Sequence, residues 1–302
     1  MEAKLLAHVS TAIHDATHHP FTLRASAPVG GGSINEAYRL EGTDGSRYFL
    51  KLNDARHLPI PSTGLRTGFA AEVEGLNTIA ATNTIRVPRP IAHGSAGGQS
   101  FLVLEHLELN SSGDASLLGE QLAALHRCTS SRFGFPADNF IGTTPQPNGW
   151  EDNWIDFWRE HRLGFQLQLA AQNGYGGTLQ SMGEKLSEAL PAFFGSYAPR
   201  PSLLHGDLWS GNHAFLPDGT SAIFDPATYY GDRECDIAMT ELFGGYPAGF
   251  YAAYRAVYPL DGGYAARRDL YNLYHILNHA NLFGGGYARQ AEQMMRGLLN
   301  LI

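Results

Sequence analysis

The segment from Leu203 to Asp225 constrains this chain more than any other. It reads LLHGDLWSGNHAFLPDGTSAIFD and presents Asp207, Asn212 and Asp225 in that order. A Pro-Asp-Gly turn at 217–219 precedes the short apolar stretch that leads to Asp225. Such a turn between extended stretches predicts a hairpin. The segment is therefore expected to bring two carboxylates and one amide to a single site.

This set of side chains suits phosphoryl transfer from ATP. That reaction needs a carboxylate to orient the acceptor hydroxyl and oxygen ligands that hold Mg²⁺ on the phosphates. Asp207 would be the base, and Asn212 and Asp225 the Mg²⁺ ligands. The kinase signature set has the same order of Asp, Asn and Asp, although its motif strings differ. A metal-dependent hydrolase is the alternative from another class, with His205, Asp207, His213 and Asp225 as ligands of Zn²⁺ or Mn²⁺.

Composition argues against a nucleic-acid partner and against disorder. The 302 residues carry a net charge of −8 and the sequence pI is about 5.9, so a broad basic surface for nucleic acid is not expected. Charged residues are only 17% of the chain, which argues against disorder.

The same composition predicts a cytoplasmic protein. The two cysteines, Cys128 and Cys235, lack metal-ligand spacing and fit a reducing compartment. We see no signal peptide and no apolar run near the roughly 20 residues that a membrane helix needs. No membrane partner is therefore expected.

The N-terminal part contains a candidate phosphate-binding hairpin. Two extended stretches within residues 21–40 flank a glycine-rich turn, whose backbone N–H groups could lie over phosphates. Further on, Lys51 lies in an apolar strand at 47–52, and Glu72 lies on a helical segment at 69–76. A strand lysine that contacts phosphates and pairs with a helix acid is typical of kinase nucleotide sites. The turn residues expected to bind nucleotide are Gly30, Gly31, Gly32, Ser33 and Asn35.

A polar linker after the apolar strand at 101–104 predicts the domain boundary. Glu105, His106 and Leu107 could offer backbone groups to an adenine edge, so we interpret 105–109 as a hinge. Residues 1–104 would form a nucleotide-binding lobe with a small antiparallel sheet, and residues 110–302 a mainly helical catalytic and substrate-binding lobe. The expected fold class is α+β with two lobes.

The C-terminal part reads as helices. Trp150, Trp154, Phe157 and Trp158 recur at helical spacing, which more often marks a core than a binding site. The tail reads as two helices over 270–299, split at a glycine triplet at 284–286. Three acids, Asp232, Glu234 and Asp236, precede or open a helix expected near residue 237, where capping or pairing with the scaffold is the usual role.

At this point the motifs resemble those of a known family. The chain is similar to fructosamine kinases, also called ketosamine-3-kinases, of the aminoglycoside-phosphotransferase and choline-kinase group of protein-kinase-like folds. The resemblance covers nearly the whole chain. It is carried by GGSINEAY at 31–38, YFLKLN at 48–53, AEVEGL at 71–76, FLVLEHL at 101–107, LGEQLAALH at 118–126, WEDNWIDFWREHRL at 150–163, LLHGDLWSGN at 203–212 and DPATYYGDRECDIAM at 225–239.

The resemblance implies ATP- and Mg²⁺-dependent phosphorylation of the 3-hydroxyl of a ketosamine, a sugar joined to an amine or to a protein lysine. Such a reaction would serve the repair of glycated amines. By the same resemblance Asp207 is the base, Lys51 contacts phosphate and Glu72 pairs with it. Trp209 would stack on the sugar, and Asp207 and Asp232 would also face the substrate.

One departure from the family pattern concerns redox control. Several relatives carry a cysteine where this chain has Ser33, so dimerisation through that thiol is not expected here. The sequence leaves the oligomeric state open, with a monomer favoured. The alternatives that remain are a kinase of another small hydroxyl compound, such as an aminoglycoside, choline or homoserine, the hydrolase, and a nucleotide-binding pseudokinase. Against the last, every expected catalytic residue type is present.

Overall fold

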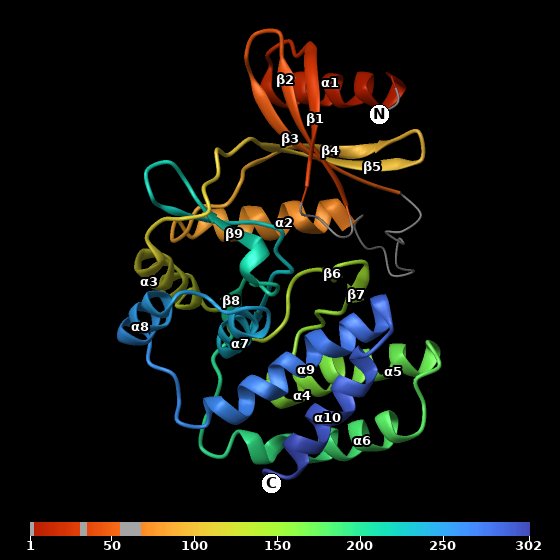
Figure 1. The fold of residues 1–302 in the computed structure, drawn as a ribbon, viewed down its shortest axis with the longest axis vertical. Coiled ribbons are helices and arrows are strands. Elements are labelled where there is room, and N and C mark those ends of the chain that lie inside the picture. The colour runs from red at the N-terminus through yellow and green to blue at the C-terminus, as the bar shows by residue number, and fades with distance from the viewer. Residues whose placement is uncertain (1–2, 31–34, 55–67) are drawn as a thin grey trace. The chain divides into compact units, whose positions relative to one another are not determined.

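A computed structural model describes residues 3–30, 35–54 and 68–302 and divides the chain into two compact units (Figure 1). Unit 1 comprises residues 1–113 and 214–224, and unit 2 comprises residues 114–213 and 225–302. The prediction placed the boundary at 105–109 and assigned everything beyond it to one lobe. It did not anticipate that 214–224 would group with the N-terminal part.

Unit 1 is built on a five-stranded antiparallel sheet in the order β1-β2-β3-β5-β4. A helix precedes the sheet and another connects β3 to β4. The elements are α1 (Ala3–Thr17), β1 (Leu23–Val29), β2 (Glu36–Gly42), β3 (Arg47–Asp54), α2 (Gly68–Ala81), β4 (Pro90–Ala96) and β5 (Gln99–Glu105).

The two faces of β3 have different partners. Leu50 and Leu52 are buried in a core that includes Leu5 and Val9 of α1. Side chains alternate along a strand, so Lys51 must point to the opposite face. Its ammonium contacts the Glu72 carboxylate of α2 there, at 2.8 Å between Nζ and Oε1. The predicted strand and helix are confirmed, and together they place this ion pair.

A short hairpin joins unit 1 from far along the chain. It consists of β9 (His213–Phe215) and β10 (Ser221–Ile223), connected through the predicted Pro-Asp-Gly turn. Phe215 forms a bridge with Asn110, and Ala222 forms a parallel bridge with Arg86. These backbone contacts explain why 214–224 group with residues that precede them by more than a hundred positions.

Unit 2 is mainly helical, so the predicted α+β class is confirmed. Its longer helices are α3 (Ala115–His126), α5 (Phe165–Gln172), α6 (Thr178–Ala189), α7 (Glu234–Leu242), α8 (Ala248–Val257), α9 (Tyr264–Phe283) and α10 (Tyr287–Leu299). The shorter elements are β6 (Asn139–Ile141), β7 (Thr144–Gln146), α4 (Trp154–Trp158), the π-helix η1 (Arg159–Gly164), η2 (Leu190–Phe193), β8 (Ser202–Leu204), η3 (Ser210–Asn212) and β11 (Tyr229–Gly231).

Aromatic side chains form much of the core of unit 2. Trp154, Phe157 and Trp158 of α4 are each at most 3% exposed, as predicted for a core stripe. The Asn153 side chain caps this helix by accepting the N–H of Ile155. The core extends to α9, where the Tyr271 hydroxyl accepts the Trp154 indole N–H at 3.0 Å. The tail also forms two helices separated by the glycine triplet, as predicted.

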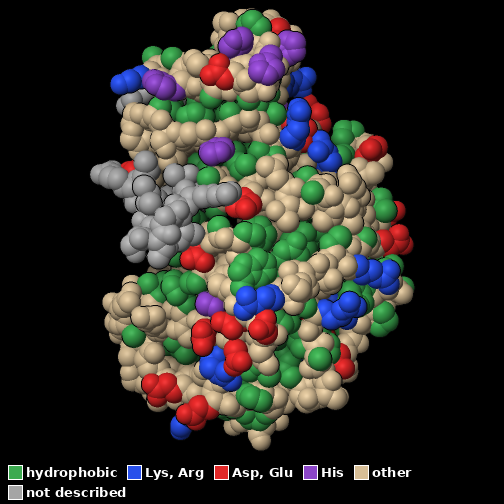
Figure 2. All heavy atoms as spheres, turned by 180° about the vertical axis from the view of Figure 1, so that it is seen from behind, with side chains coloured by type: hydrophobic (Ala, Val, Ile, Leu, Met, Phe, Trp, Pro, Cys, Tyr) green, Lys and Arg blue, Asp and Glu red, His purple; other side chains and the backbone are tan. Residues whose placement is uncertain are grey.

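On the face that Figure 2 shows, Lys and Arg side chains lie in small groups near Asp and Glu side chains. Each helix within the described residues is too short or too polar to cross a membrane.

Helices α3 and α8 pack closely because α3 has a glycine at their contact. A Cβ atom on Gly119 would lie only 2.3 Å from the carbonyl oxygen of Phe250. We therefore expect Gly119→Ala to lower the free energy of unfolding by about 1–3 kcal/mol, as overpacking does. Urea denaturation followed by circular dichroism measures the change.

Gly297 of α10 provides a matched control. It is exposed, and a Cβ atom there would meet no atom within 4 Å. Gly297→Ala should raise the free energy of unfolding by up to about 1 kcal/mol through helix propensity alone. Equal effects of the two substitutions would contradict the proposed close packing.

Candidate active site

The loop after β8 carries the predicted base, and Gly206 allows its shape. Gly206 has a φ of 85°, in the left-handed region that favours glycine. A Cβ atom there would lie 2.1 Å from the carbonyl oxygen of Ala227. Any other residue would force the loop away from the strand that follows. The backbone therefore requires a glycine at the middle position of the His-Gly-Asp motif.

The buried carboxylate of Asp236 fixes this loop through hydrogen bonds to its backbone. Asp236 of α7 accepts the backbone N–H of His205 at 2.7 Å and that of Gly206 at 2.8 Å. Its Oδ2 atom also lies 3.0 Å from His126 Nε2 at the end of α3. Asp236 is 1% exposed and His126 is fully buried. The two residues just before Asp207 are therefore fixed by one side chain.

The pKa of Asp236 reflects these contacts. Burial alone would raise it, because a charged carboxylate loses its hydration. The hydrogen bond and electrostatic interaction with His126, together with His205 and the Gly206 N–H, outweigh burial and hold the pKa of Asp236 below its usual value. Asp236 is therefore a charged anchor for the loop. On the far side of the imidazole, His126 Nδ1 lies 2.8 Å from the Tyr254 hydroxyl.

Asp207 and Asn212 contact each other. The Asn212 amide nitrogen donates to the Asp207 carbonyl at 2.8 Å and to its carboxylate at 3.3 Å. Because the amide nitrogen is used in this way, the amide oxygen is the atom available to a cation. Asn212 is buried at the end of η3, while Asp207 is half-buried.

Asp207 has the protonation behaviour of a poised base. Burial raises its pKa to about 7, and the negative charges of Asp225 and, less strongly, Asp236 act in the same direction. The hydrogen bond from Asn212 opposes this rise. A carboxylate with a pKa near the operating pH is suited to accept a proton.

Asp225 stands immediately after the hairpin and has an unusual backbone. Its φ of 59° lies in the left-handed region, which only two other non-glycine residues adopt among those the structure describes. Such backbone strain tends to persist at functional sites. The Asp225 carboxylate lies close enough to Asp207 for its charge to raise the pKa of Asp207.

These residues fit a divalent cation. Two carboxylates converge with an amide oxygen, and hard oxygen ligands of this kind suit Mg²⁺. The repulsion between Asp207 and Asp225 is the kind of unfavourable charge pairing that a bound cation relieves. Asn212 and Asp225 could hold the ion, and Asp207 would remain for the acceptor.

The predicted ion pair between Lys51 and Glu72 is confirmed. Their side chains are 6% and 12% exposed, so water screens the pair little. A buried lysine needs such a partner. Both residues belong to unit 1, whereas the Asp207 group belongs to unit 2. Contact of Lys51 with a nucleotide stays a prediction.

The other predicted nucleotide residues lie at the ends of strands in unit 1. Gly30 follows β1 and is exposed, and the Asn35 side chain accepts a hydrogen bond from Asn53 at 2.7 Å. Gly31, Gly32 and Ser33 lie outside the described residues.

The predicted hinge begins at the end of β5. Glu105 accepts the backbone N–H of Arg89 and lies 2.7 Å from the Arg86 guanidinium, which fixes the start of this segment. His106 and Leu107 follow, half-buried, and burial lowers the pKa of His106. Contact of residues 105–107 with adenine stays a prediction.

Trp209 lies half-buried beside Asp207 and is supported from two sides. Its ring covers Gly211, where a Cβ atom would lie 2.2 Å from the indole. The Tyr246 hydroxyl donates to its carbonyl oxygen at 3.1 Å. The Trp209 backbone is therefore held by Tyr246 and its indole packs on Gly211. Contact of Trp209 with a sugar stays a prediction.

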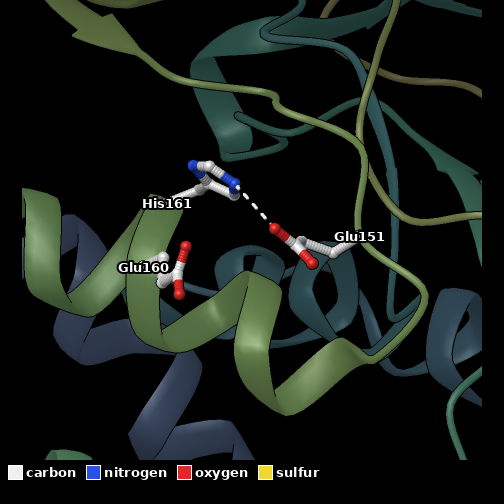
Figure 3. Close-up of side chains that lie close together, drawn as sticks. All are labelled: Glu151, Glu160 and His161. Carbon is white, nitrogen blue, oxygen red and sulfur yellow. Dashed lines mark ion pairs between the residues drawn. The ribbon is translucent and has the colours of Figure 1, made fainter.

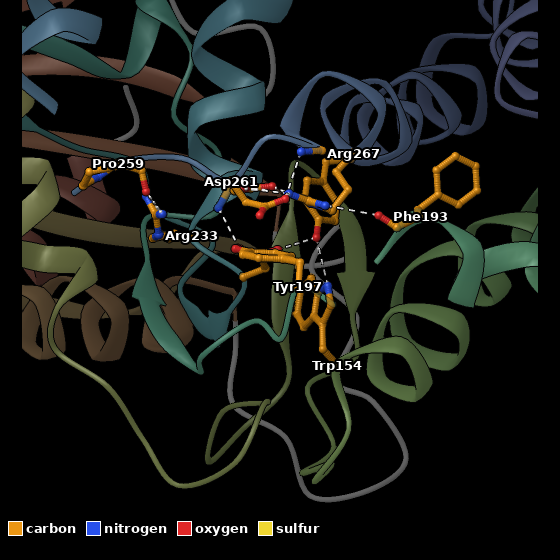
Figure 4. Close-up of polar contacts among 11 residues, drawn as sticks. Trp154, Phe193, Tyr197, Arg233, Pro259, Asp261 and Arg267 are labelled. Atoms are coloured by element: carbon orange, nitrogen blue, oxygen red, sulfur yellow. Dashed lines mark hydrogen bonds and ion pairs between the residues drawn. The ribbon is translucent and has the colours of Figure 1, made fainter. Parts of the chain in front are cut away.

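Asp232 lies in a buried polar network that includes Tyr197, which Figure 4 labels near Arg267. Its carboxylate accepts the hydroxyl of Tyr197 at 2.9 Å and that of Tyr271 at 2.6 Å, and it is fully buried. Nearby, Arg267 forms an ion pair with Glu234 at 2.7 Å. This geometry gives no support to contact between Asp232 and substrate, so that role stays a prediction. These contacts fit the other role considered for Asp232 and Glu234, which is pairing with the scaffold.

The four residues of the hydrolase alternative do not bring three ligand atoms together. Over residues 3–30, 35–54 and 68–302, the one group of three His, Cys, Asp or Glu ligand atoms within 4.8 Å of one another is Glu151, Glu160 and His161 (Figure 3). Glu160 and His161 belong to η1, and Glu151 precedes α4. His205 is fully buried, and the ring of His213 packs on Tyr246 at 4.3 Å between centroids.

Sequence reasoning missed two supports of the site. His126 was not considered as a partner of Asp236, although a histidine at the end of an apolar helix was a visible signal. Tyr246 was not considered at all, and nothing in its local sequence indicates a contact with Trp209. Both contacts join residues far apart in the chain, which local patterns do not reveal.

Comparison with known proteins identifies close relatives over the full length. The fructosamine kinase family model matches residues 5–301. A probable ketoamine kinase of Synechocystis sp. is 49% identical over 297 residues, which cover 97% of this chain and 96% of the relative. A chloroplastic protein-ribulosamine 3-kinase of Oryza sativa subsp. indica is 42% identical over 278 residues, covering 91% of this chain and 78% of that protein.

Solved structures agree with these relatives. A candidate fructosamine-3-kinase from Haemophilus somnus has a TM-score of 0.85 and 29% identity, with 96% of each chain covered. The ADP-bound aminoglycoside phosphotransferase APH(2'')-Ib has a TM-score of 0.64 at 11% identity, covers 99% of each chain, and so shows the kinase-like fold alone. The predicted two-lobed, protein-kinase-like fold is confirmed. The chain belongs to the fructosamine kinase family.

Proposed function

We propose that this protein is an ATP-dependent kinase that phosphorylates the 3-hydroxyl of ketosamines. The observation that carries the proposal is the Asp207 site, in which a base of raised pKa, an amide and a second carboxylate converge on a loop fixed by Asp236. Membership of the family supports the substrate class. Phosphoryl transfer depends mainly on positioning and charge, which this site supplies.

Each residue of the site would have a distinct task. Asp207 would accept a hydrogen bond from the acceptor hydroxyl and take its proton as that oxygen bonds to the γ-phosphorus of ATP and the bond from this phosphorus to ADP breaks. Asn212 and Asp225 would hold Mg²⁺, which when bound neutralises charge on the phosphates. Asn212 also orients Asp207 through their hydrogen bond. The Trp209 indole offers an apolar face to the sugar.

Unit 1 would supply the nucleotide site. Lys51 would contact the α- and β-phosphates while Glu72 holds its ammonium in place. Gly30 to Asn35 would cover the phosphates, and residues 105–107 would contact adenine. Cys128 is half-buried, Cys235 is buried and both thiols are free, as expected for a reducing compartment. We propose that the enzyme acts in the cytoplasm as a monomer, in the repair of glycated amines.

A coupled ADP-release assay across a panel of acceptors tests this function. We expect turnover with ribulose and fructose adducts of lysine, and weaker turnover with free ribulose. NMR should locate the phosphate on O3. Turnover confined to kanamycin, choline or homoserine would refute the ketosamine assignment and leave a kinase of another substrate. Omission of Mg²⁺ should abolish ADP release.

Asp207→Asn should abolish most turnover and stabilise the fold at high pH. Loss of a general base lowers kcat by roughly 10² to 10⁴. The folded pKa of about 7 exceeds the unfolded value of about 3.9, so the native state retains a proton that the unfolded state has lost. Stability therefore falls as pH rises from about 4 to about 7, and the full cost is present above that range.

Asparagine cannot ionise, so the variant avoids this cost. In metal-free buffer at pH 8, we expect a gain of up to about 4 kcal/mol in the free energy of unfolding. The difference from wild type should vanish near pH 4. A variant that keeps most of its kcat would remove Asp207 from the role of base.

Asp236→Asn should lower kcat by displacing the loop. An amide cannot accept both backbone N–H groups of His205 and Gly206 as a carboxylate does. We expect a roughly 10- to 100-fold loss of kcat, with the KM for ATP changed less than threefold, because the nucleotide contacts lie elsewhere.

Asp232→Asn is the matched control, since Asp232 is equally buried but does not contact the loop. Both variants should lose stability, and only Asp236→Asn should lose kcat. If Asp232→Asn instead raised the KM for the ketosamine at unchanged kcat, Asp232 would regain its predicted role in substrate binding.

A further inference from the structure

A group of aromatic side chains near the catalytic loop has no part in the reaction described above. It consists of Phe243, His279, Phe283 and Tyr287, which we call the aromatic cluster. The His279 ring lies at its centre. Its centroid is 5.1 Å from that of Phe243, 5.5 Å from that of Phe283 and 5.1 Å from that of Tyr287.

The end of α9 creates this arrangement. Gly284 and Gly285 both have left-handed φ angles, of 66° and 64°, and the Gly284 N–H donates to the Ala280 carbonyl at 2.9 Å. Two such residues reverse the chain sharply. Tyr287 therefore opens α10 close to the helix that has just ended. The His279 ring is fixed by a 2.7 Å hydrogen bond from Nδ1 to the His275 carbonyl.

The aromatic cluster is joined to the catalytic loop by the segment between α7 and α8. The Ser210 hydroxyl donates to the Phe243 carbonyl at 3.4 Å, and Ser210 directly follows Trp209. Three residues beyond Phe243, the Tyr246 hydroxyl donates to the Trp209 carbonyl. The backbone at Phe243 is therefore hydrogen-bonded to the residue that follows Trp209.

The outer part of the cluster is open to solvent. Phe283 is 53% exposed, whereas Phe243 and Tyr287 are partly buried and pack against the core of unit 2. The cluster therefore has one part packed on the core, at Phe243 and Tyr287, and one part exposed to solvent, at Phe283. Aromatic faces of this kind bind hydrocarbon chains and attract ammonium groups.

We propose that the aromatic cluster binds the hydrocarbon arm of the amine to which the ketose is joined, so that lysine adducts are preferred over adducts of short amines. This inference rests on the proposed function, because it requires a ketosamine whose sugar lies at Asp207. The sugar is polar and is bound near Trp209. The lysine arm beyond it has four methylene groups and a secondary ammonium, and aromatic faces attract both kinds of group.

A homologous series of acceptors tests the inference. Ribulose adducts of methylamine, propylamine and pentylamine differ only in methylene groups. Full burial of one methylene is worth about 0.8 kcal/mol, or about fourfold in binding. On a half-exposed surface we expect kcat/KM of the wild type to rise about twofold per methylene.

Phe283→Ala should flatten this series. The expected change is about a fivefold increase in KM for the pentylamine adduct, with kcat within twofold of wild type and the methylamine adduct unaffected. The KM for ATP should not move. Leu301→Ala is the matched control, because Leu301 is also an exposed apolar residue of unit 2, at 63%, outside the cluster. It should behave as the wild type does.

The remaining outcomes overturn the inference in distinguishable ways. Equal effects of Phe283→Ala on all three adducts, or no effect on any, would remove the cluster from acceptor recognition while the proposed function stands. A change in self-association with unchanged kinetics would assign the cluster to a contact between copies of this chain. No turnover of any adduct by the wild type would refute both the function and the inference.

Discussion

The carboxylate of Asp236 is the contact on which the candidate site depends. It brings together the N–H groups of His205 and Gly206 and the imidazole of His126, so one buried charge joins the catalytic loop to the end of α3. Burying that charge is costly, and the hydrogen bonds offset the cost. Removing a single donor would leave the carboxylate poorly satisfied. These contacts fix the backbone of the loop just before Asp207 and so position Asp207.

Several features around Asp207 lower the stability of the fold. Asp207 and Asp225 repel each other, Asp225 holds a left-handed backbone, and Gly206 tolerates no side chain. These features are unfavourable without a cation and a substrate. The Lys51–Glu72 pair differs, because its two charges satisfy each other within unit 1. The chain thus places two mutually repelling carboxylates at the candidate site and an ion pair of opposite charges within unit 1.

Sequence patterns predicted what depends on local periodicity and spacing. Lys51 and Glu72 could be paired because strand alternation and helix spacing fix where each side chain points. Asp207, Asn212 and Asp225 could be grouped because a recognisable turn returns the chain. The hold of Asp236 on the loop, the contact of Tyr246 with Trp209, and the bridges that place 214–224 in unit 1 could not. Each joins residues that only the folded chain brings together. The burial of Asp232, whose contact with substrate stays a prediction, is likewise not visible in its sequence position.

The segment between α7 and α8 connects chemistry to recognition. The segment follows the helix that carries Asp236. Its first residue, Phe243, belongs to the aromatic cluster, and its Tyr246 donates a hydrogen bond to the Trp209 carbonyl. A shift of this segment would change the support of Trp209 and the position of Phe243 together. If Trp209 and the aromatic cluster have the proposed roles, acceptor recognition and alignment of the acceptor hydroxyl would be coupled through about ten residues of backbone, counted from Asp236 to Tyr246. Binding energy gained on the amine arm would then hold the sugar against the base, because remote contacts contribute to catalysis when they restrict the reacting group.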